Sequence, residues 1–378
     1  MRLHEYEAMD IFKQHGIPVP EGEVATTPEE AQKVARRLGC PVVLKAQVLV
    51  GGRGLAGGIR MVHSPEEAQA VSAELLGSEI RGFPVRLLLI AKEVAIEEEL
   101  YMGITVDGYE GKPVVLVSTE GGMNIEEVAK RSPEKIASLH VRSYHGLFPY
   151  EARGLLGGLG LPPKGLLACT DLLVRLYKVF VDCNALIAEI NPLARVSGGG
   201  LVALDAVLEV DDSALHRLGS KVSSKLERIE NPLERKGREI GVTYVDMEGD
   251  IGIISSGAGL GMATMDIVAR KLRPANFLET GGGITEELLY RTMELMMMKE
   301  GLRAIFINIY GGINPIHEGA RGIVRYIEEH DVRIPIVAKA LGNRQEETWE
   351  IFRSGGVHVV TEVSTEKAVD YLFEILGV

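Results

Sequence analysis

The first part of the chain alternates short apolar runs with two helices that begin with the same signal. The segments TPEE at 27–30 and SPEE at 64–67 each place a hydroxyl side chain before a proline, with a glutamate three positions after the hydroxyl. This order is typical of an N-cap, a first helical residue and an N3 carboxylate. Between these starts, the apolar runs 41–50 and 55–62 flank a glycine-rich segment. The pattern predicts two helices and, between them, two strands joined by a glycine-rich loop.

Three further apolar stretches extend this first domain, at 87–91, 101–119 and 185–209. The last two each contain two apolar halves separated by turn residues, which fits antiparallel hairpins better than β-α-β units. The domain is therefore expected to be α+β. Charged, helical sequence follows from about residue 211 to 243, and we expect the domain boundary near residue 235.

After residue 235 the pattern changes to five apolar runs that alternate with helical segments. The runs are 251–255, 275–279, 304–309, 335–339 and 357–361. This rhythm predicts a doubly wound α/β domain with a parallel sheet of about five strands. Several runs end in small or glycine-rich loops (SSGAGLG, TGGG and YGG), and ligands of such sheets bind beyond the carboxyl ends of the strands. A second ligand site is expected there.

Composition narrows the class of protein. A chain of 378 residues with 46% hydrophobic content can form two or more domains with separate cores. We find neither a long uncharged apolar run nor a basic segment followed by an apolar one at the start, so we expect no membrane span and a cytoplasmic location. A net charge of -12 makes nucleic acid an unexpected partner. The three cysteines lack CxxC spacing, which favours reduced thiols over disulfides or zinc.

Lys45 stands in the apolar segment VVLKAQV, where an unpaired ammonium group would be costly. It needs an anion. The glycine-rich segment GGRG follows at 51–54, so Arg53 and the backbone amides of Gly52 and Gly54 could contact the same phosphates as Lys45. The alternative is an ordinary turn with a surface arginine beside a lysine that extends its ammonium to solvent.

Polar residues interrupt the apolar hairpin at 185–209 at defined spacing. Glu189 and Asn191 are two positions apart, so they share one face of a strand. If the turn centres on Gly198, Asn191 lies opposite Asp205, with Cβ atoms about 5 Å apart. A carboxylate and a carboxamide oxygen that converge in this way match the ligands that Mg²⁺ prefers. The alternative is the solvated face of an amphipathic hairpin.

Glu99 ends an acidic run immediately before Leu100. It therefore stands at the edge of a buried strand, where a carboxylate can accept hydrogen bonds from ribose hydroxyls.

In the second domain, IGIISSGAGLG at 251–261 resembles a dinucleotide fingerprint. Its glycine spacing is GxGxG and not GxGxxG, and the domain is too short for a two-halved dinucleotide fold, so we do not expect NAD.

The segment YGGINP at 310–315 predicts the start of a helix, with Asn314 as N-cap and Pro315 as the first helical residue. The free amides after the glycine pair would form an anion pocket suited to a phosphate. Ordinary helix capping is the alternative.

No histidine lies in a glycine-rich loop beside an obvious carboxylate, so we expect no phosphohistidine in this chain.

Seven segments then point to one family. In order they are LHEYEAMDIF, AQVLVGGRGLAGG, STEGGMNIEEVA, AEINPL, GAGLGMATMDIV, PANFLETGGG and NIYGGI. With these segments the chain resembles, over nearly its whole length, the β subunits of succinyl-CoA synthetase (succinate-CoA ligase). The resemblance implies an ATP-grasp domain over 1–235, which includes an inserted ATP-binding subdomain at 20–100, and a flavodoxin-like CoA-ligase domain over 236–378.

The resemblance also implies roles for individual residues. The nucleotide would be bound by seven of them: Lys45, Gly52, Arg53, Gly54, Ala91, Val94 and Glu99. Asn191 and Asp205 would hold Mg²⁺, and Glu189 would be the catalytic carboxylate that faces a phosphohistidine. The second site, for that histidine and the substrate, would use Ser256, Gly312, Ile313 and Asn314.

The implied reaction is the reversible ligation of succinate and CoA in the citric acid cycle, coupled to ATP/ADP or GTP/GDP. An α subunit would carry the phosphohistidine and most of the CoA site. Ala91 stands where many members have glutamate, and Glu93 nearby could accept the N1 and N2 donors of guanine, so the base stays open. Ser256 likewise replaces an asparagine of many members. Two alternatives are a malate-CoA ligase β subunit and a single-chain ATP-grasp ligase that forms an acyl phosphate.

Overall fold

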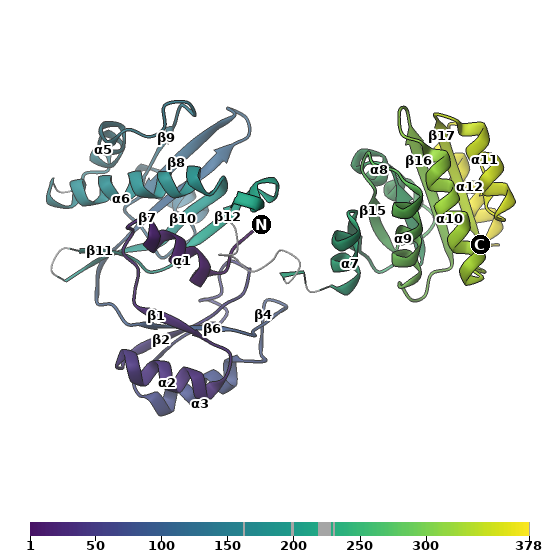
Figure 1. Cartoon of the computed structure of the whole chain (residues 1–378). Helices are drawn as coiled ribbons and strands as arrows, with labels where there is room; N and C mark the ends of the chain where they lie inside the picture. The colour runs from purple at the N-terminus through teal and green to yellow at the C-terminus, as the bar shows by residue number, and fades with distance from the viewer. Residues whose placement is uncertain (162, 198–199, 218–227, 230, 378) are drawn as a thin grey trace. The chain divides into compact units, whose positions relative to one another are not determined.

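The computed structural model describes residues 1–161, 163–197, 200–217, 228–229 and 231–377. The chain forms two compact units, Met1–Val222 and Ser223–Val378 (Figure 1). Among the described residues, no helix combines the length and the apolar character that crossing a membrane would need.

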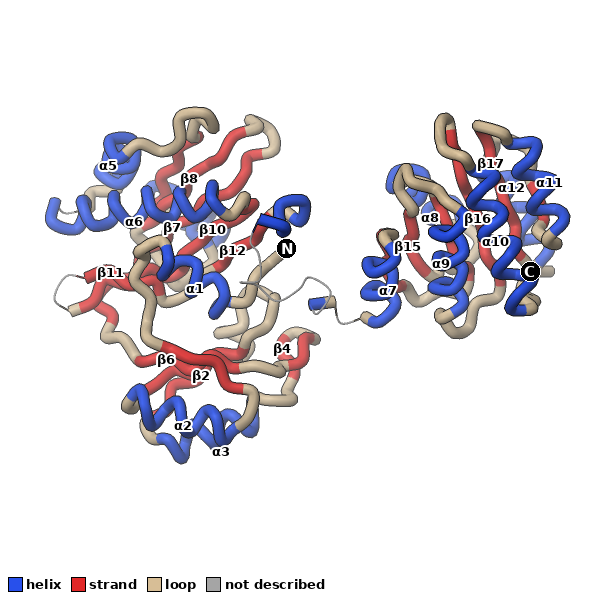
Figure 2. The backbone as a smooth tube through the Cα atoms, in the orientation of Figure 1, coloured by secondary structure: helices blue, strands red, loops and turns tan. Residues whose placement is uncertain are grey.

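A small four-stranded sheet forms the part of the first unit that holds the glycine-rich loop. Its order is β1-β6-β2-β3, with bounds Gly22–Ala25 (β1), Leu88–Lys92 (β6), Val42–Ala46 (β2) and Ile59–Val62 (β3). Helices α2 (Pro28–Leu38) and α3 (Pro65–Leu75) pack together on one side of this sheet (Figure 2). Both predicted starts are confirmed, because the side chains of Thr27 and Ser64 accept hydrogen bonds from the backbone N–H groups of Glu30 and Glu67.

The larger sheet of the first unit contains the two predicted hairpins. Its order is β11-β10-β7-β8-β9, and β12 also pairs with β10. The bounds are Ile96–Asp107 (β7), Lys112–Ser118 (β8), Ile136–His140 (β9), Ala185–Val196 (β10), Gly200–Ala203 (β11) and Val207–Val210 (β12). All of these pairings are antiparallel.

Helices cover this sheet through one continuous apolar core. They are α1 (Glu5–Gln14), α5 (Pro149–Gly158) and α6 (Pro163–Asp182). Shorter elements complete the unit: β4 (Glu79–Ile80), β5 (Phe83–Pro84), α4 (Ile125–Arg131), η1 (Pro133–Lys135) and η2 (Asp212–Arg217). Strands β4 and β5 form a separate two-stranded sheet. The first unit is thus an α+β fold, as its alternation and hairpin signals predict.

The second unit is the predicted doubly wound domain. Five parallel strands lie in the order β15-β14-β16-β17-β18, with bounds Asn276–Glu279, Ile251–Ser255, Ala304–Gly311, Ile336–Gly342 and His358–Val359. Counted along the chain this is the order 2-1-3-4-5 of flavodoxin-like sheets. A sixth strand, β13 (Thr243–Asp246), pairs antiparallel with β15 at the edge and was not expected.

Two apolar cores lie on the two faces of this sheet. One includes residues of α7 (Pro232–Ile240), α9 (Glu286–Met297), α10 (Ile316–His330) and α11 (Gln345–Ser354). The other includes residues of α8 (Ala258–Ala269) and α12 (Thr365–Ile375).

The junction between the units lies earlier than residue 235. The second unit begins at Ser223, and a boundary at 235 would divide α7, which packs on β13 and α9. The charged sequence of α7 does not predict this packing, because only one face of the helix is buried. The buried residues on that face are Gly237 and Ile240.

Candidate functional site

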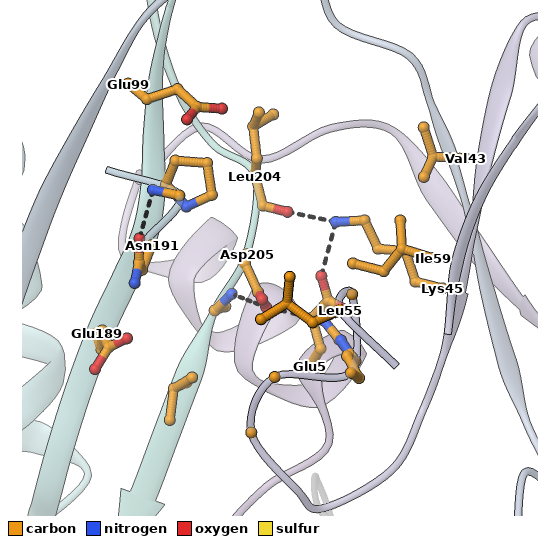
Figure 3. Close-up of a pocket in the computed structure, with 18 of the residues that line it drawn as sticks. Glu5, Val43, Lys45, Leu55, Ile59, Glu99, Glu189, Asn191, Leu204 and Asp205 are labelled. Carbon is orange, nitrogen blue, oxygen red and sulfur yellow. Dashed lines mark hydrogen bonds and ion pairs between the residues drawn. The ribbon is translucent and has the colours of Figure 1, made fainter. Parts of the chain in front are cut away.

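A cavity of about 1290 Å³ lies within the first unit (Figure 3). Its walls come from β2, the glycine-rich loop, the segment that links β6 to β7, and the chain around β10 and β12. All ten residues that the sequence assigned to nucleotide, metal and catalysis in this unit line it: Lys45, Gly52, Arg53, Gly54, Ala91, Val94, Glu99, Glu189, Asn191 and Asp205. The fold thus brings them together.

Lys45 of β2 is buried, and its ammonium has two partners from distant segments. Nζ lies 2.9 Å from Oε1 of Glu5 and also donates to the carbonyl oxygen of Leu204 (Figure 3). The anion that the sequence required beside Lys45 is therefore present within the protein. It comes from the first turn of α1.

Arg53 of the glycine-rich loop is 7% exposed. Its Nη2 forms ion pairs with Oε2 of Glu5 and, at 3.0 Å, with Oδ1 of Asp205, while Nη1 donates to the carbonyl of Ala46 at 3.1 Å. Arg53 is thus not the surface arginine of an ordinary turn, and that alternative is wrong. The loop closes on itself through a 2.9 Å hydrogen bond from Gly58 N–H to the Arg53 carbonyl.

Glu5 connects the two cations and was not singled out from the sequence. Its side chain is 2% exposed, and it also accepts a 3.0 Å hydrogen bond from Nε2 of Gln47. Burial works against its ionisation, but the charges of Lys45 and Arg53 hold the pKa of Glu5 below its ordinary value. In the sequence Glu5 looks like any acidic residue in the first turn of a helix.

Asn191 and Asp205 lie where the β10 ladder passes from β11 to β12. The flanking pairs Leu193–Ala203 and Glu189–Val207 are in register, and this register is the one expected for a turn about residue 198, which lies outside the described residues. The carboxamide oxygen of Asn191 accepts a 2.8 Å hydrogen bond from Gly122 N–H, and its Nδ2 donates to the Met123 carbonyl at 2.9 Å.

The charges in this part of the cavity fit a cation. Burial and the nearby charge of Glu5 raise the pKa of Asp205, and burial together with Asp205 raises the pKa of Glu189. The oxygen of Asn191 keeps a second lone pair. Among the described residues, no group of three or more His, Cys, Asp and Glu side chains has the arrangement of a metal site. An ion at Asn191 and Asp205 would therefore take its remaining ligands from phosphates and water, as Mg²⁺ usually does.

The residues expected near the nucleoside also line this cavity. Ala91 is buried in β6, and Val94 follows that strand. Glu99 of β7 lies against Gly122, where an added Cβ would be 2.4 Å from Oε2 of Glu99. Glu93 also lines the cavity and is exposed, so it is available to a ligand.

In the second unit, the loops at the carboxyl ends of three parallel strands are tied together. The hydroxyl of Ser256, after β14, accepts a 3.0 Å hydrogen bond from Tyr310 N–H and donates to the Tyr310 carbonyl at 3.1 Å. After β17, Asn343 N–H donates to the Gly311 carbonyl at 2.7 Å, and its Nδ2 donates to the Ile313 carbonyl at 3.3 Å.

Gly312 and Ile313 are exposed on this surface, and Ile313 is 92% exposed. The predicted helix start is wrong by one residue, because α10 begins at Ile316 and Pro315 takes the N-cap position. The Asn314 carbonyl instead accepts a 2.9 Å hydrogen bond from Ile316 N–H. The amides at the start of a helix of this length still favour an anion.

Comparison with known proteins adds to this geometry. An ATP-grasp domain model matches residues 2–195, and a CoA-ligase model matches residues 254–371. The chain is 40% identical over 371 residues to the "Succinate--CoA ligase [GDP-forming] subunit beta" of Thermus thermophilus, covering 98% of each chain. It is 43% identical over 358 residues to the "Succinate--CoA ligase [ADP-forming] subunit beta" of Ignicoccus hospitalis, covering 94% of this chain and 95% of that one. The chain belongs to the succinate-CoA ligase β-subunit family.

Family membership makes the chain part of an acid-thiol ligase, and these relatives do not favour the malate-CoA ligase or single-chain ligase alternatives. A solved ATP citrate lyase of Methanothrix soehngenii, in complex with citrate and coenzyme A, has the same fold. Its TM-score is 0.79 at 20% identity, with 99% of both chains covered. The CoA-ligase match includes the GxGxG residues 257–261.

Proposed function

We propose that this chain is the nucleotide-binding β subunit of a succinate-CoA ligase, and that it transfers a phosphoryl group between a nucleotide and a histidine of an α subunit. The observation that carries the proposal is the convergence of two kinds of group on one cavity. Two buried cations, Lys45 and Arg53, line the same cavity as the oxygen donors Asn191 and Asp205, and Arg53 pairs with Asp205. Glu189 lies on the same strand as Asn191.

The roles follow from the chemistry of phosphoryl transfer, which depends on positioning and charge neutralisation. Lys45 and Arg53 bind the nucleotide phosphates, assisted by the amides of Gly52 and Gly54. Asn191 and Asp205 hold Mg²⁺, which when bound neutralises phosphate charge. Ala91 and Val94 border the base, and Glu99 accepts hydrogen bonds from the ribose.

Glu189 is the proposed catalytic carboxylate. It accepts a hydrogen bond from the imidazole of the α subunit and orients the ring toward the phosphate. This chain supplies the carboxylate and the phosphate site, and the α subunit supplies the nucleophile and most of the CoA site. A cytoplasmic location completes the proposal, in keeping with cysteines at positions 40, 169 and 183 that form no disulfide with one another.

The second unit provides the proposed site at which the phosphohistidine meets succinate and CoA. The exposed amides of Gly312 and Ile313, Asn314 and the start of α10 are suited to a phosphate, and Ser256 lies beside them through Tyr310. The side chain of Ser256 already bonds the Tyr310 backbone. The Ser256 side chain would therefore shape the site more than it would contact the substrate directly.

The test is phosphorylation of the α subunit. The chain is mixed with α, and γ-labelled ATP and GTP are compared side by side at saturating magnesium. We expect acid-labile label on α, absent when the candidate histidine of α is replaced, and the faster nucleotide identifies the base. Label on this chain, or ligase turnover without α, would overturn the proposal. A coupled assay with succinate against malate then identifies the acid.

A further inference from the structure

Tyr101 reaches the carboxylate of Glu189 across the two central strands of the larger sheet. β7 and β10 are antiparallel, and Gly103 of β7 is the direct cross-strand partner of Glu189. Tyr101 lies two positions before Gly103, so it points to the same face and is a diagonal neighbour of Glu189, within reach of an aromatic side chain. Its hydroxyl oxygen lies 3.4 Å from Oε2 of Glu189.

Gly103 provides the space for this contact. An added Cβ at position 103 would lie 2.3 Å from the hydroxyl oxygen of Tyr101 and 2.8 Å from its Cζ. The phenol ring therefore lies directly over the backbone of Gly103. Any side chain at that position would push the ring away from its place beside Glu189, because protein interiors have no spare volume for such an overlap.

The contact comes from the protein interior and not from the cavity. Tyr101 is 4% exposed, and it does not line the cavity that contains Lys45, Asp205 and Glu189. Burial and the neighbouring charge of Glu189 raise the pKa of the Tyr101 hydroxyl, so it stays protonated and can donate. Glu189 thus has a buried donor behind it and open space in front.

We propose that Tyr101 is a positioning residue for Glu189, and that Gly103 provides the space that lets the phenol reach it. The inference rests on the proposed role of Glu189 toward the partner's imidazole. A carboxylate whose one oxygen is held by a fixed donor presents the other oxygen in a defined direction, and such orientation contributes to transfer. Because Tyr101 lies outside the cavity, the affinity for nucleotide does not depend on it.

Two variants disturb the contact by independent means. Tyr101→Phe removes only the hydroxyl, and Gly103→Ala displaces the ring. For both, we expect single-turnover phosphorylation of α to slow about 10- to 100-fold, with an unchanged KM for nucleotide. Thr105→Val is the matched control, because it also removes a hydroxyl from this face of β7. The Thr105 hydroxyl donates to the Leu186 carbonyl at 3.1 Å and not to Glu189. This control variant should leave the rate unchanged.

A double-mutant cycle with Glu189→Gln decides the outcome. If Tyr101 acts through Glu189, Tyr101→Phe slows the wild-type chain but adds nothing in the Glu189→Gln background. A full additional loss in that background, or a raised nucleotide KM with an unchanged rate, would overturn the inference. If Gly103→Ala does not fold, Tyr101→Phe decides alone.

The cycle also separates this inference from the proposed function. A wild-type rate in Tyr101→Phe, with Glu189→Gln impaired, would overturn only the positioning role. A wild-type rate in Glu189→Gln would instead remove Glu189 from the mechanism, and the inference about Tyr101 with it.

Discussion

The ammonium of Lys45 lies 2.9 Å from Oε1 of Glu5, and neither side chain is more than 10% exposed. The same carboxylate pairs through Oε2 with Arg53. Helix α1 thus places one buried anion between the two cations that we assign to the nucleotide phosphates. This arrangement holds the two cations close together, although like charges repel, and it makes Glu5 important for both stability and binding.

We predict that Glu5→Gln destabilises the first unit by about 3–5 kcal/mol, because it leaves two buried cations with one fewer counter-ion. Denaturant unfolding of the full chain measures the effect. Glu7→Gln is the matched control, since Glu7 is a buried glutamate of the same helix whose Oε2 accepts a hydrogen bond from His4 N–H. An equal loss in both variants would contradict a special role for the ion-pair cluster.

Asp205→Ala is expected to reduce phosphorylation of the α subunit at least about 100-fold, the cost of losing one electrostatic contact at a transferring group. The reason is the loss of a proposed magnesium ligand that also pairs with Arg53. Labelling of α at increasing magnesium concentrations tests this. Asp211→Ala serves as control, because Asp211 follows β12 outside the cavity. Unchanged transfer at saturating magnesium would remove Asp205 from the metal site.

Gly322→Ala should destabilise the second unit by about 1–3 kcal/mol or more. Gly322 lies where α10 crosses α9, and an added Cβ would be 2.0 Å from the Glu286 carbonyl oxygen and 3.0 Å from the Tyr290 nitrogen. Gly154→Ala in α5 is the opposite case, because nothing lies within 4 Å of its added Cβ. There the better helix propensity of alanine should stabilise by up to about 1 kcal/mol. Calorimetry of the full chain shows whether Gly322→Ala lowers the stability and Gly154→Ala raises it.

The acid stability of the second unit should depend on Asp246. Burial opposes its ionisation, but hydrogen bonds from Lys299 at 2.7 Å and Asn231 at 3.2 Å hold the pKa of Asp246 below its ordinary value. A carboxyl whose pKa is lowered by folding stabilises the fold above its unfolded pKa, about 3.9. That stabilisation is lost as the pH falls through the folded pKa.

Asp246→Asn should therefore lower the free energy of unfolding at pH 7 and flatten its decline below about pH 4. Unfolding curves from pH 7 to pH 2.5 measure both effects. Asp370→Asn is the control, because Asp370 forms an exposed ion pair with Lys271, and such pairs contribute little. Parallel pH profiles for wild type and Asp246→Asn would contradict the prediction.

Much of the fold follows from local signals in the chain. The hydroxyl, proline and glutamate at 27–30 and 64–67 specify two helix starts through contacts within four residues. The alternation of apolar runs with helical segments after residue 235 predicts the five parallel strands of the second unit, but their order comes from the structure. These features depend on neighbours in sequence, so spacing alone is enough to predict them. The family motifs predicted which residues of the first unit form one site, and these residues line one cavity in the structure.

Long-range contacts explain what local pattern did not predict. Glu5 meets Lys45 and Arg53, Arg53 meets Asp205, and Tyr101 meets Glu189, across 40 to 152 residues of chain. Nothing near each residue in sequence reports its partner. The short edge strand β13 and the packing of α7 were not predicted from the sequence for the same reason. The order of residues was sufficient for the helix starts at Pro28 and Pro65, for the parallel strands and for the family. The partner of each buried charge instead depends on how the folded backbone brings distant segments together. This is because a charge in the interior must find its counter-ion wherever the fold supplies one.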